Sequence, residues 1–261
     1  MTPTLPLPDN RFLRALRAGT PQIGLWCALG DAYAAEIVAG AGFDWLLLDG
    51  EHGPSEVESL LAQLQAVAPY PATAVVRPAS NDPVRIKRCL DIGAQSLLVP
   101  YVESAEEARR AVAAVRYPPG GIRGVAGLTR ASRFGRVPGY LTGAPDELCL
   151  LVQVETARAL DEIEAIAAVD GVDGIFIGPS DLSASLGRIG ELAHPDVVAA
   201  VEGALRRVVR AGVPAGILTA DDAEAERCLG LGATFVAVGL DVGLLARGAD
   251  RLAERFARQR P

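Results

Sequence analysis

Eight short apolar runs recur along the sequence, and segments with helical spacing lie between them. Most of the runs are apolar at every position rather than at alternate positions, which is typical of parallel strands that are covered on both faces. In the intervening segments the apolar residues recur at helical intervals, which indicates amphipathic helices. The predicted strands are Ile23–Ala28, Trp45–Leu48, Thr73–Val76, Ser96–Val99, Leu150–Val154, Gly174–Ile177, Ala215–Leu218 and Phe235–Val238.

This repeated order of strand and helix predicts the fold class. Eight periods over 261 residues favour an α/β fold of the (β/α)8, or TIM-barrel, type over an open doubly wound sheet. The open sheet stays an alternative, because a sequence does not show whether a sheet closes on itself. We find no linker between domains, so we predict a single domain over residues 1–261.

The segment Leu244–Gln259 has the pattern of a further amphipathic helix after the last predicted strand. One barrel does not need this extra helix, and a spare helix of this kind often packs on a neighbouring subunit. We therefore expect a homo-oligomer.

Charge and composition exclude several classes of protein. The net charge is −7 and no basic run is interleaved with aromatic residues, so we expect no nucleic-acid partner. No apolar run approaches the roughly 20 residues that cross a bilayer, and residues 1–10 lack the charged-then-apolar order of a signal peptide. The 4 cysteines lie far apart and fit neither disulfide nor zinc spacing. We therefore expect a cytoplasmic protein with no membrane partner.

Two carboxylates follow neighbouring predicted strands. Glu155 directly follows the fifth strand, Asp181 shortly follows the sixth, and one predicted helix, Ala157–Val169, separates the two strands. Such a βαβ unit makes the strands parallel neighbours, so both acids should emerge at the carboxyl edge of the sheet. Two carboxylates held together repel each other unless a cation or a shared proton lies between them. A divalent metal ion is the simpler answer, and the alternative is that each acid merely caps a helix.

The expected ion is Mg²⁺ or Mn²⁺, or a similar ion such as Co²⁺, because two carboxylates leave positions for substrate and water oxygens. The chain has 2 histidines, His52 and His194, which excludes a zinc site with three histidines. The only lysine, Lys87, lies inside a predicted helix rather than at a strand end, which argues strongly against Schiff-base chemistry.

Further polar residues follow other predicted strands. His52 could act as a general base at physiological pH if a carboxylate fixes its tautomer, and Asp49 is the nearest candidate. Arg77 suits a carboxylate or a developing enolate oxygen, and the alternative for it is an ion pair with Asp49 or Glu51.

Two other groups complete the predicted site. Backbone N–H groups of Gly178, Ser180 and Asp181 could bind an anion at the start of a short helix. Trp26 is expected either to wall the mouth of the barrel or to belong to the core. The predicted substrate-binding residues are Trp26, Arg123, Gln153, Gly178, Ser180 and Leu218.

An interval of about thirty irregular residues, Tyr117–Leu148, breaks the regular alternation. It carries four arginines in a chain that is acidic overall: Arg123, Arg130, Arg133 and Arg136. We expect either a cover over an anionic ligand or a surface loop that packs a subunit interface.

Six sequence blocks resemble those of the metal-dependent class II pyruvate aldolases, and they follow one another in the same order as in that family. The likeness covers nearly the whole chain, and that family includes 4-hydroxy-2-oxoheptanedioate aldolase and 2-keto-3-deoxy-L-rhamnonate aldolase. One departure is Arg123-Gly124-Val125-Ala126-Gly127, where the family commonly reads Arg-Gly-Val-Gly. The blocks are Leu48-Asp49-Gly50-Glu51-His52, Val76-Arg77-Pro78, Leu97-Leu98-Val99-Pro100, Ile122-Arg123-Gly124-Val125, Val152-Gln153-Val154-Glu155-Thr156 and Gly178-Pro179-Ser180-Asp181-Leu182-Ser183.

The resemblance implies an assembly as well as a fold. Members are (β/α)8 barrels whose last helix is exchanged between subunits of a hexamer, a trimer of dimers. It further implies that Asp91 is a candidate partner of His52 across a subunit boundary.

The resemblance also implies roles for the residues at the strand ends. Glu155 and Asp181 would ligate the metal ion, which pyruvate chelates through its carboxylate and keto oxygens, and Gln153 would line the site. Arg77 would contact the keto oxygen, and His52 would serve as acid and base.

The resulting hypothesis is reversible retro-aldol cleavage of a 4-hydroxy-2-oxo acid, such as 4-hydroxy-2-oxoheptanedioate or a 2-keto-3-deoxy sugar acid. The products are pyruvate and an aldehyde, formed through a metal-bound enolate. The alternatives are a lyase acting on acyl-CoA thioesters, of the citrate-lyase-like group, a dehydratase, and a non-catalytic barrel that binds 2-oxo acids.

Overall fold

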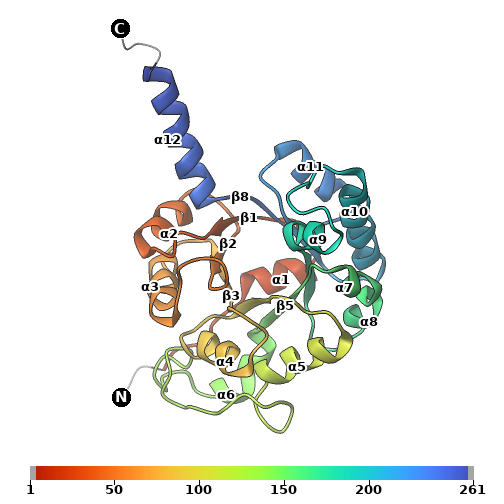
Figure 1. Cartoon of the computed structure of the whole chain (residues 1–261). Helices are drawn as coiled ribbons and strands as arrows, with labels where there is room; N and C mark the ends of the chain where they lie inside the picture. The colour runs from red at the N-terminus through yellow and green to blue at the C-terminus, as the bar shows by residue number, and fades with distance from the viewer. Residues whose placement is uncertain (1–3, 258–261) are drawn as a thin grey trace.

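The eight predicted strands form one closed parallel barrel in the computed structural model, which describes residues 4–257 (Figure 1). The strands follow one another around the barrel in chain order, and β8 pairs with β1 to close it. The prediction of a (β/α)8 barrel is therefore confirmed, and the described residues form a single domain around it. The strands are β1(Gln22–Cys27), β2(Trp45–Asp49), β3(Thr73–Arg77), β4(Ser96–Val99), β5(Cys149–Val154), β6(Gly174–Ile177), β7(Ala215–Leu218) and β8(Phe235–Leu240).

The helices surround the barrel, and N-cap side chains determine where several of them begin. Asp31, Asp82 and Ser104 each accept hydrogen bonds from backbone N–H groups at the beginning of a helix. The helices are α1(Arg11–Arg17), α2(Ala32–Ala39), α3(Val57–Val67), α4(Pro83–Asp91), α5(Ala105–Val115), α6(Tyr140–Gly143), η1(Ala144–Glu147), α7(Ala157–Asp161), α8(Ile163–Ala167), α9(Pro179–Ser185), α10(Pro195–Arg210), α11(Asp222–Gly230) and α12(Asp241–Ala257).

The single helix predicted over Ala157–Val169 is present as two short helices, α7 and α8, and this part of the prediction is wrong. The chain leaves α-helical geometry at Glu162, whose N–H donates to the carbonyl groups of Ala159 and Leu160. That tight turn changes the direction of the chain, and Ile163 and Ile166 of α8 are buried in the core.

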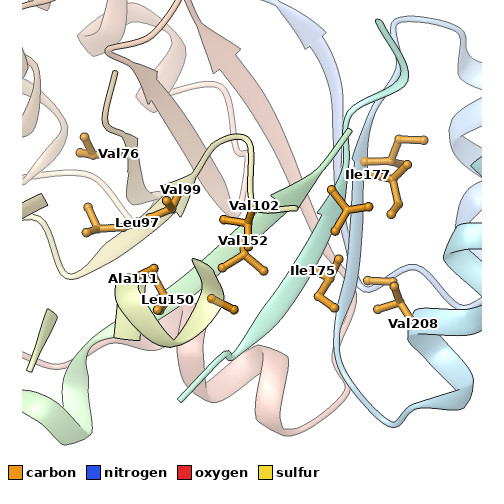
Figure 2. Packing of buried hydrophobic residues seen from close by; sticks show 14 of the residues in the cluster. Val76, Leu97, Val99, Val102, Ala111, Leu150, Val152, Ile175, Ile177 and Val208 are labelled. Carbon is orange, nitrogen blue, oxygen red and sulfur yellow. The ribbon is translucent and has the colours of Figure 1, made fainter. Parts of the chain in front are cut away.

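The larger hydrophobic core lies between the strands and the surrounding helices (Figure 2). Val152 of β5 and Ile175 of β6 are buried completely, as is Ala111 of α5. Val208 of α10 packs in the same cluster. Burying each large aliphatic side chain contributes about 1.5–3 kcal/mol, so this layer fixes the strands whose ends carry the polar groups.

Aromatic rings fill the inside of the barrel. Phe12 of α1 lies with its ring centroid 5.6 Å from that of Trp45 and 6.1 Å from that of Phe235, so α1 closes the amino end of the barrel. Gly216 lies against the ring of Phe235, and a Cβ atom there would fall well inside van der Waals contact with it. The barrel interior is therefore packed below its mouth rather than open.

Replacing Gly216 with alanine should lower the free energy of unfolding by about 1–3 kcal/mol, because Phe235 is buried and cannot move aside without strain. Gly203, in the middle of α10, is the matched control, since nothing lies within 4 Å of an added Cβ atom. Gly203→Ala should raise the stability by about 0.5–1 kcal/mol through helix propensity. Urea unfolding of both variants checks this, and equal midpoints would contradict the packing described.

The helix α12 extends away from the barrel, in dark blue in Figure 1. Its side chains Leu244, Leu245, Leu252 and Phe256 are each more than half exposed, at 57%, 63%, 60% and 55%. The predicted helix Leu244–Gln259 is confirmed over its described part and begins earlier, at Asp241, whereas its end at Gln259 lies outside the described residues. Exchange of this helix between subunits stays a prediction. None of the helices in residues 4–257 is long and apolar enough to cross a bilayer.

Candidate active site

Glu155 and Asp181 lie at the carboxyl end of two paired strands. Val154 of β5 pairs with Ile177 of β6, so the chain delivers both acids to the same edge of the sheet. The two acids are joined through Tyr101, whose phenol donates to Asp181 Oδ1 at 2.7 Å and whose backbone N–H donates to Glu155 Oε1 at 2.8 Å. The matched placement predicted from the strand ends is thus present in the structure.

Negative charge accumulates around Glu155. The pKa of Glu155 is raised to about 7, mainly by burial and also by the nearby carboxylates of Glu51 and Asp181, although hydrogen bonds from Tyr101 and Gln153 act to lower it. Glu51 is itself partly buried, and burial raises its pKa above the usual value. Three carboxyl groups therefore share one mouth, where a cation would relieve their repulsion.

Arg77, the last residue of β3, is held in a network of buried polar groups. Its Nη2 lies 2.6 Å from Asp49 Oδ2 and its Nε donates to Asp49 Oδ1 at 3.0 Å, so the pair is bidentate. Its Nη1 lies 2.8 Å from Glu51 Oε2 and 3.5 Å from Gln153 Oε1. The ion pairs expected as the alternative for Arg77 are therefore present, and they fix its guanidinium beside the acids.

Asp49 anchors this network from below. Burial raises the pKa of Asp49, but the hydrogen bond and charge of Arg77 more than offset it, so the pKa lies below the usual value. Trp26 donates its indole N–H to Asp49 Oδ2 at 3.0 Å, and its ring lies 4.7 Å from the guanidinium carbon of Arg77. Trp26 is buried in the barrel core and forms the floor of the mouth.

His52 is the most exposed of the predicted catalytic groups, with 62% of its side chain accessible. Its Nε2 lies 3.9 Å from Glu51 Oε2, whereas Asp49 accepts only the backbone N–H of His52, at 3.3 Å. Within one chain, Asp49 thus fixes the loop that carries His52, and Glu51 is the carboxylate next to the imidazole. The acid–base role of His52 stays a prediction.

Gln153 and Gly178 shape the surroundings of Glu155. The amide of Gln153 donates to Glu155 Oε2 at 2.5 Å, so Gln153 connects Glu155 to Arg77. Gly178 donates its N–H to Val154 O, which leaves the backbone N–H groups of Ser180 and Asp181 for the predicted anion site. A Cβ atom on Gly178 would lie 2.7 Å from Glu155 Oε2 and 2.9 Å from Gln153 Nε2.

Gly178→Ala should therefore displace the Glu155 carboxylate and lower kcat/KM by about tenfold or more, because a small misplacement of a positioned group is costly. The expected loss appears in steady-state kinetics with little change in far-UV circular dichroism. Gly203→Ala serves again as the control and should keep normal kinetics. Normal kinetics in Gly178→Ala would show that Glu155 has room to move.

Leu218 and Ser180 lie on the wall of a hollow beside this mouth. The hollow has a volume of about 830 Å³ and is lined mainly by apolar side chains, among them Leu192, Val198 and Leu240. The predicted substrate-binding roles of Leu218 and Ser180 stay predictions.

Arg123 and Asp91 lie at the opposite end of the barrel from the acids. Asp91 is the last residue of α4, just before β4 begins, and its carboxylate lies 2.7 Å from Arg123 Nη2. Arg123 is buried, and its guanidinium lies 4.5 Å from the ring centre of Tyr117. Within one chain neither residue joins His52 or Arg77, so their predicted roles there would require a second copy.

The irregular segment Tyr117–Leu148 also packs at this amino end. Arg130 donates to the carbonyl of Ile92, and the Ala131 N–H donates to the carbonyl of Asp91. Within one chain the segment does not cover the barrel's own mouth, so the expected cover does not form over the chain's own site. The alternative, a subunit interface, stays a prediction.

Tyr101 contacts both acids but is not among the site residues that the sequence predicts. Its position two residues after β4 marks it as a strand-end residue, and that rule would have found it. Its hydrogen bond to Asp181 raises its pKa above the usual value, so the phenol stays protonated and can donate.

The closed barrel and the charged groups at the carboxyl ends of its strands define a TIM-barrel enzyme. The chain belongs to the HpcH/HpaI aldolase/citrate lyase family, whose model matches residues 22–248. This agrees with the resemblance seen in the sequence blocks.

The chain is similar over nearly its whole length to named aldolases and to a solved structure. A pyruvate aldolase from Rhizobium etli is 64% identical, over 96% of this chain and 99% of its own. A 4-hydroxy-2-oxo-heptane-1,7-dioate aldolase from Salmonella heidelberg is 58% identical, over 96% of both chains. The crystal structure of a family member from Burkholderia cenocepacia superposes with a TM-score of 0.91 at 42% identity, covering 96% of this chain and 100% of that one.

Proposed function

We propose that this chain catalyses the reversible retro-aldol cleavage of a 4-hydroxy-2-oxo acid to pyruvate and an aldehyde. The observation that carries the proposal is the joined pair of Glu155 and Asp181 beside the buried guanidinium of Arg77. The names of relatives at 58% and 64% identity point to the same reaction.

We further propose that Glu155 and Asp181 hold a divalent ion, Mg²⁺, Mn²⁺ or Co²⁺. Two carboxylates are hard oxygen ligands of the kind these ions prefer, and the raised pKa of Glu155 reflects repulsion and burial that a cation would offset. Within residues 4–257 no group of three or more His, Cys, Asp or Glu side chains is arranged to hold a metal ion. When bound, the ion would supply Lewis-acid polarisation of the 2-oxo acid oxygens.

The chain's own residues then account for the movement of charge. His52 takes the proton of the C4 hydroxyl, and the C3–C4 bond then breaks. The electron pair of that bond stays with C3 and forms the enolate of pyruvate, while C4 leaves as the aldehyde. Arg77 stabilises the negative charge that develops on the C2 oxygen, because Asp49 and Glu51 hold its guanidinium in place beforehand. A proton delivered to C3 gives pyruvate.

We also propose that the enzyme is a cytoplasmic homo-oligomer, with a hexamer as the expected form. The exposed leucines of α12 favour docking of that helix on a neighbouring subunit, where their burial would be favourable. The four buried free cysteines favour a reducing compartment. Light scattering of the full chain tests the oligomer, and a monomer at micromolar concentration would contradict it.

A screen of pyruvate with a panel of aldehydes tests the proposed reaction. Succinic semialdehyde, lactaldehyde and glyceraldehyde, each with Mg²⁺ or Mn²⁺, should yield 4-hydroxy-2-oxo acids that NMR identifies. At least one aldehyde should react, and the aldehyde that reacts fastest indicates the natural substrate class. Failure of all aldehydes, with pyruvate still bound, would favour a binding protein instead.

A further inference from the structure

The three residues after β4 turn across the carboxyl end of β5. Pro100 restricts the backbone on one side of the turn. On the other side, Val102 is buried and donates its N–H to Gln153 O at 3.0 Å. Tyr101 lies between these two fixed neighbours, so its backbone has little freedom.

Tyr101 adopts a backbone conformation that large side chains seldom take. Its φ is 51°, in the left-handed region, where an aromatic residue is strained. Strain of this kind persists only where the surroundings impose it, and it is found most often at functional sites. In this conformation the N–H reaches Glu155 while the phenol reaches Asp181.

The ring of Tyr101 contributes little to the core, because the residue is 46% exposed. It makes two hydrogen bonds to acids from two different βα units. The phenol contacts Oδ1 of Asp181 and so orients the whole carboxylate, including Oδ2. Hydrogen bonds of this kind to a carboxylate ligand orient it and tune its affinity for a metal ion.

We propose that Tyr101 is a positioning residue that holds Asp181 in place, relative to Glu155, for binding a divalent ion. The proposal rests on the proposed function, since it assumes that these two acids are the metal ligands. Tyr101 acts through Asp181 and takes no part in the bond changes.

Titration with Mn²⁺, followed by the electron paramagnetic resonance signal of the free ion, tests this role. Tyr101→Phe keeps the ring and the backbone N–H and removes only the phenol oxygen, so the Kd for Mn²⁺ should rise about 10–100-fold. Tyr101→Asn also lacks the phenol, and asparagine tolerates the left-handed backbone conformation, so its Kd for Mn²⁺ should rise by the same factor. This variant replaces Tyr101→Phe if Tyr101→Phe folds poorly. At saturating Mn²⁺ the kcat of Tyr101→Phe should return to within about threefold of the unmodified enzyme.

Two matched variants complete the design. Tyr33→Phe changes a tyrosine that is 73% exposed on α2 and should leave the Kd unchanged. Glu155→Gln should abolish tight Mn²⁺ binding and so identify the titrated site. An unchanged Kd in Tyr101→Phe, or a lost kcat that saturating Mn²⁺ does not restore, overturns the role of Tyr101 while the proposed function stands. An unmodified enzyme that binds no Mn²⁺ overturns both.

Discussion

Arg77→Ala should lower kcat/KM by about 10²–10³-fold, which is the usual cost of removing a fixed donor to a developing oxyanion. The effect should fall mainly on kcat, because the charge on the C2 oxygen develops only in the transition state. Arg77 is also the buried partner of Asp49, so its removal leaves a buried carboxylate unpaired. That loss should cost about 3–5 kcal/mol of stability, measured by urea unfolding.

Arg77→Lys separates the two effects. Lysine keeps a positive charge near Asp49 but cannot make the bidentate contact, so most of the stability should return while much of the activity stays lost. Arg158→Ala is the control, since Arg158 is 70% exposed and its ion pair is with Glu103, at 3.4 Å. An Arg77→Lys enzyme with normal kcat would contradict the role given to the guanidinium.

Glu155→Gln should lower kcat by at least about 10²-fold, because the amide keeps the size of the side chain but cannot neutralise a cation. The substitution should not unfold the protein, since it removes a buried charge that Glu51 and Asp181 repel. Steady-state kinetics and thermal unfolding, measured over a series of Mn²⁺ concentrations, check both expectations.

Glu164→Gln is the matched control for that change. Glu164 is an exposed carboxylate on α8, and the hydrogen bond from Arg207 lowers its pKa to about 2. Its substitution should leave both kcat and the metal requirement unchanged. If Glu155→Gln behaves like Glu164→Gln, the pair of acids does not carry the reaction.

The fold could be predicted because its signals are local. Runs such as Trp45–Leu48 and Leu97–Val99 are apolar throughout, and each lies in a buried strand. Closure of the barrel was an inference from the number of periods, and the pairing of β8 with β1 confirmed it. The break between α7 and α8 was missed, because a local turn at Glu162 leaves the helical spacing of apolar residues intact.

The site could be predicted only as far as strand ends determine it. Glu155, Asp181, Arg77 and Asp49 meet because their strands are neighbours or lie around one mouth. The spacing of Asp49 and His52 suggested a hydrogen-bonded pair, but Arg77 takes both oxygens of Asp49. Competition between partners depends on three-dimensional distances, and a linear sequence does not show it.

The position of the irregular segment was harder to predict. Its arginines suggested a cover over an anionic ligand, but Arg130 donates to a backbone carbonyl at the amino end of the barrel. Composition indicates the charge of a loop and not the end of the barrel on which it packs. Whether Arg123 and Asp91 approach the mouth of another subunit depends on how two copies of the chain pack together.

Exchange of the pyruvate methyl protons in deuterated water tests the central claim most directly, because it reports enolate formation without any aldehyde. After exhaustive chelation with EDTA the methyl signal should persist, and added Mg²⁺ or Mn²⁺ should make it disappear. Glu155→Gln should not respond to the added ion. Full-rate exchange after exhaustive chelation, or no exchange with any divalent ion present, would contradict the account.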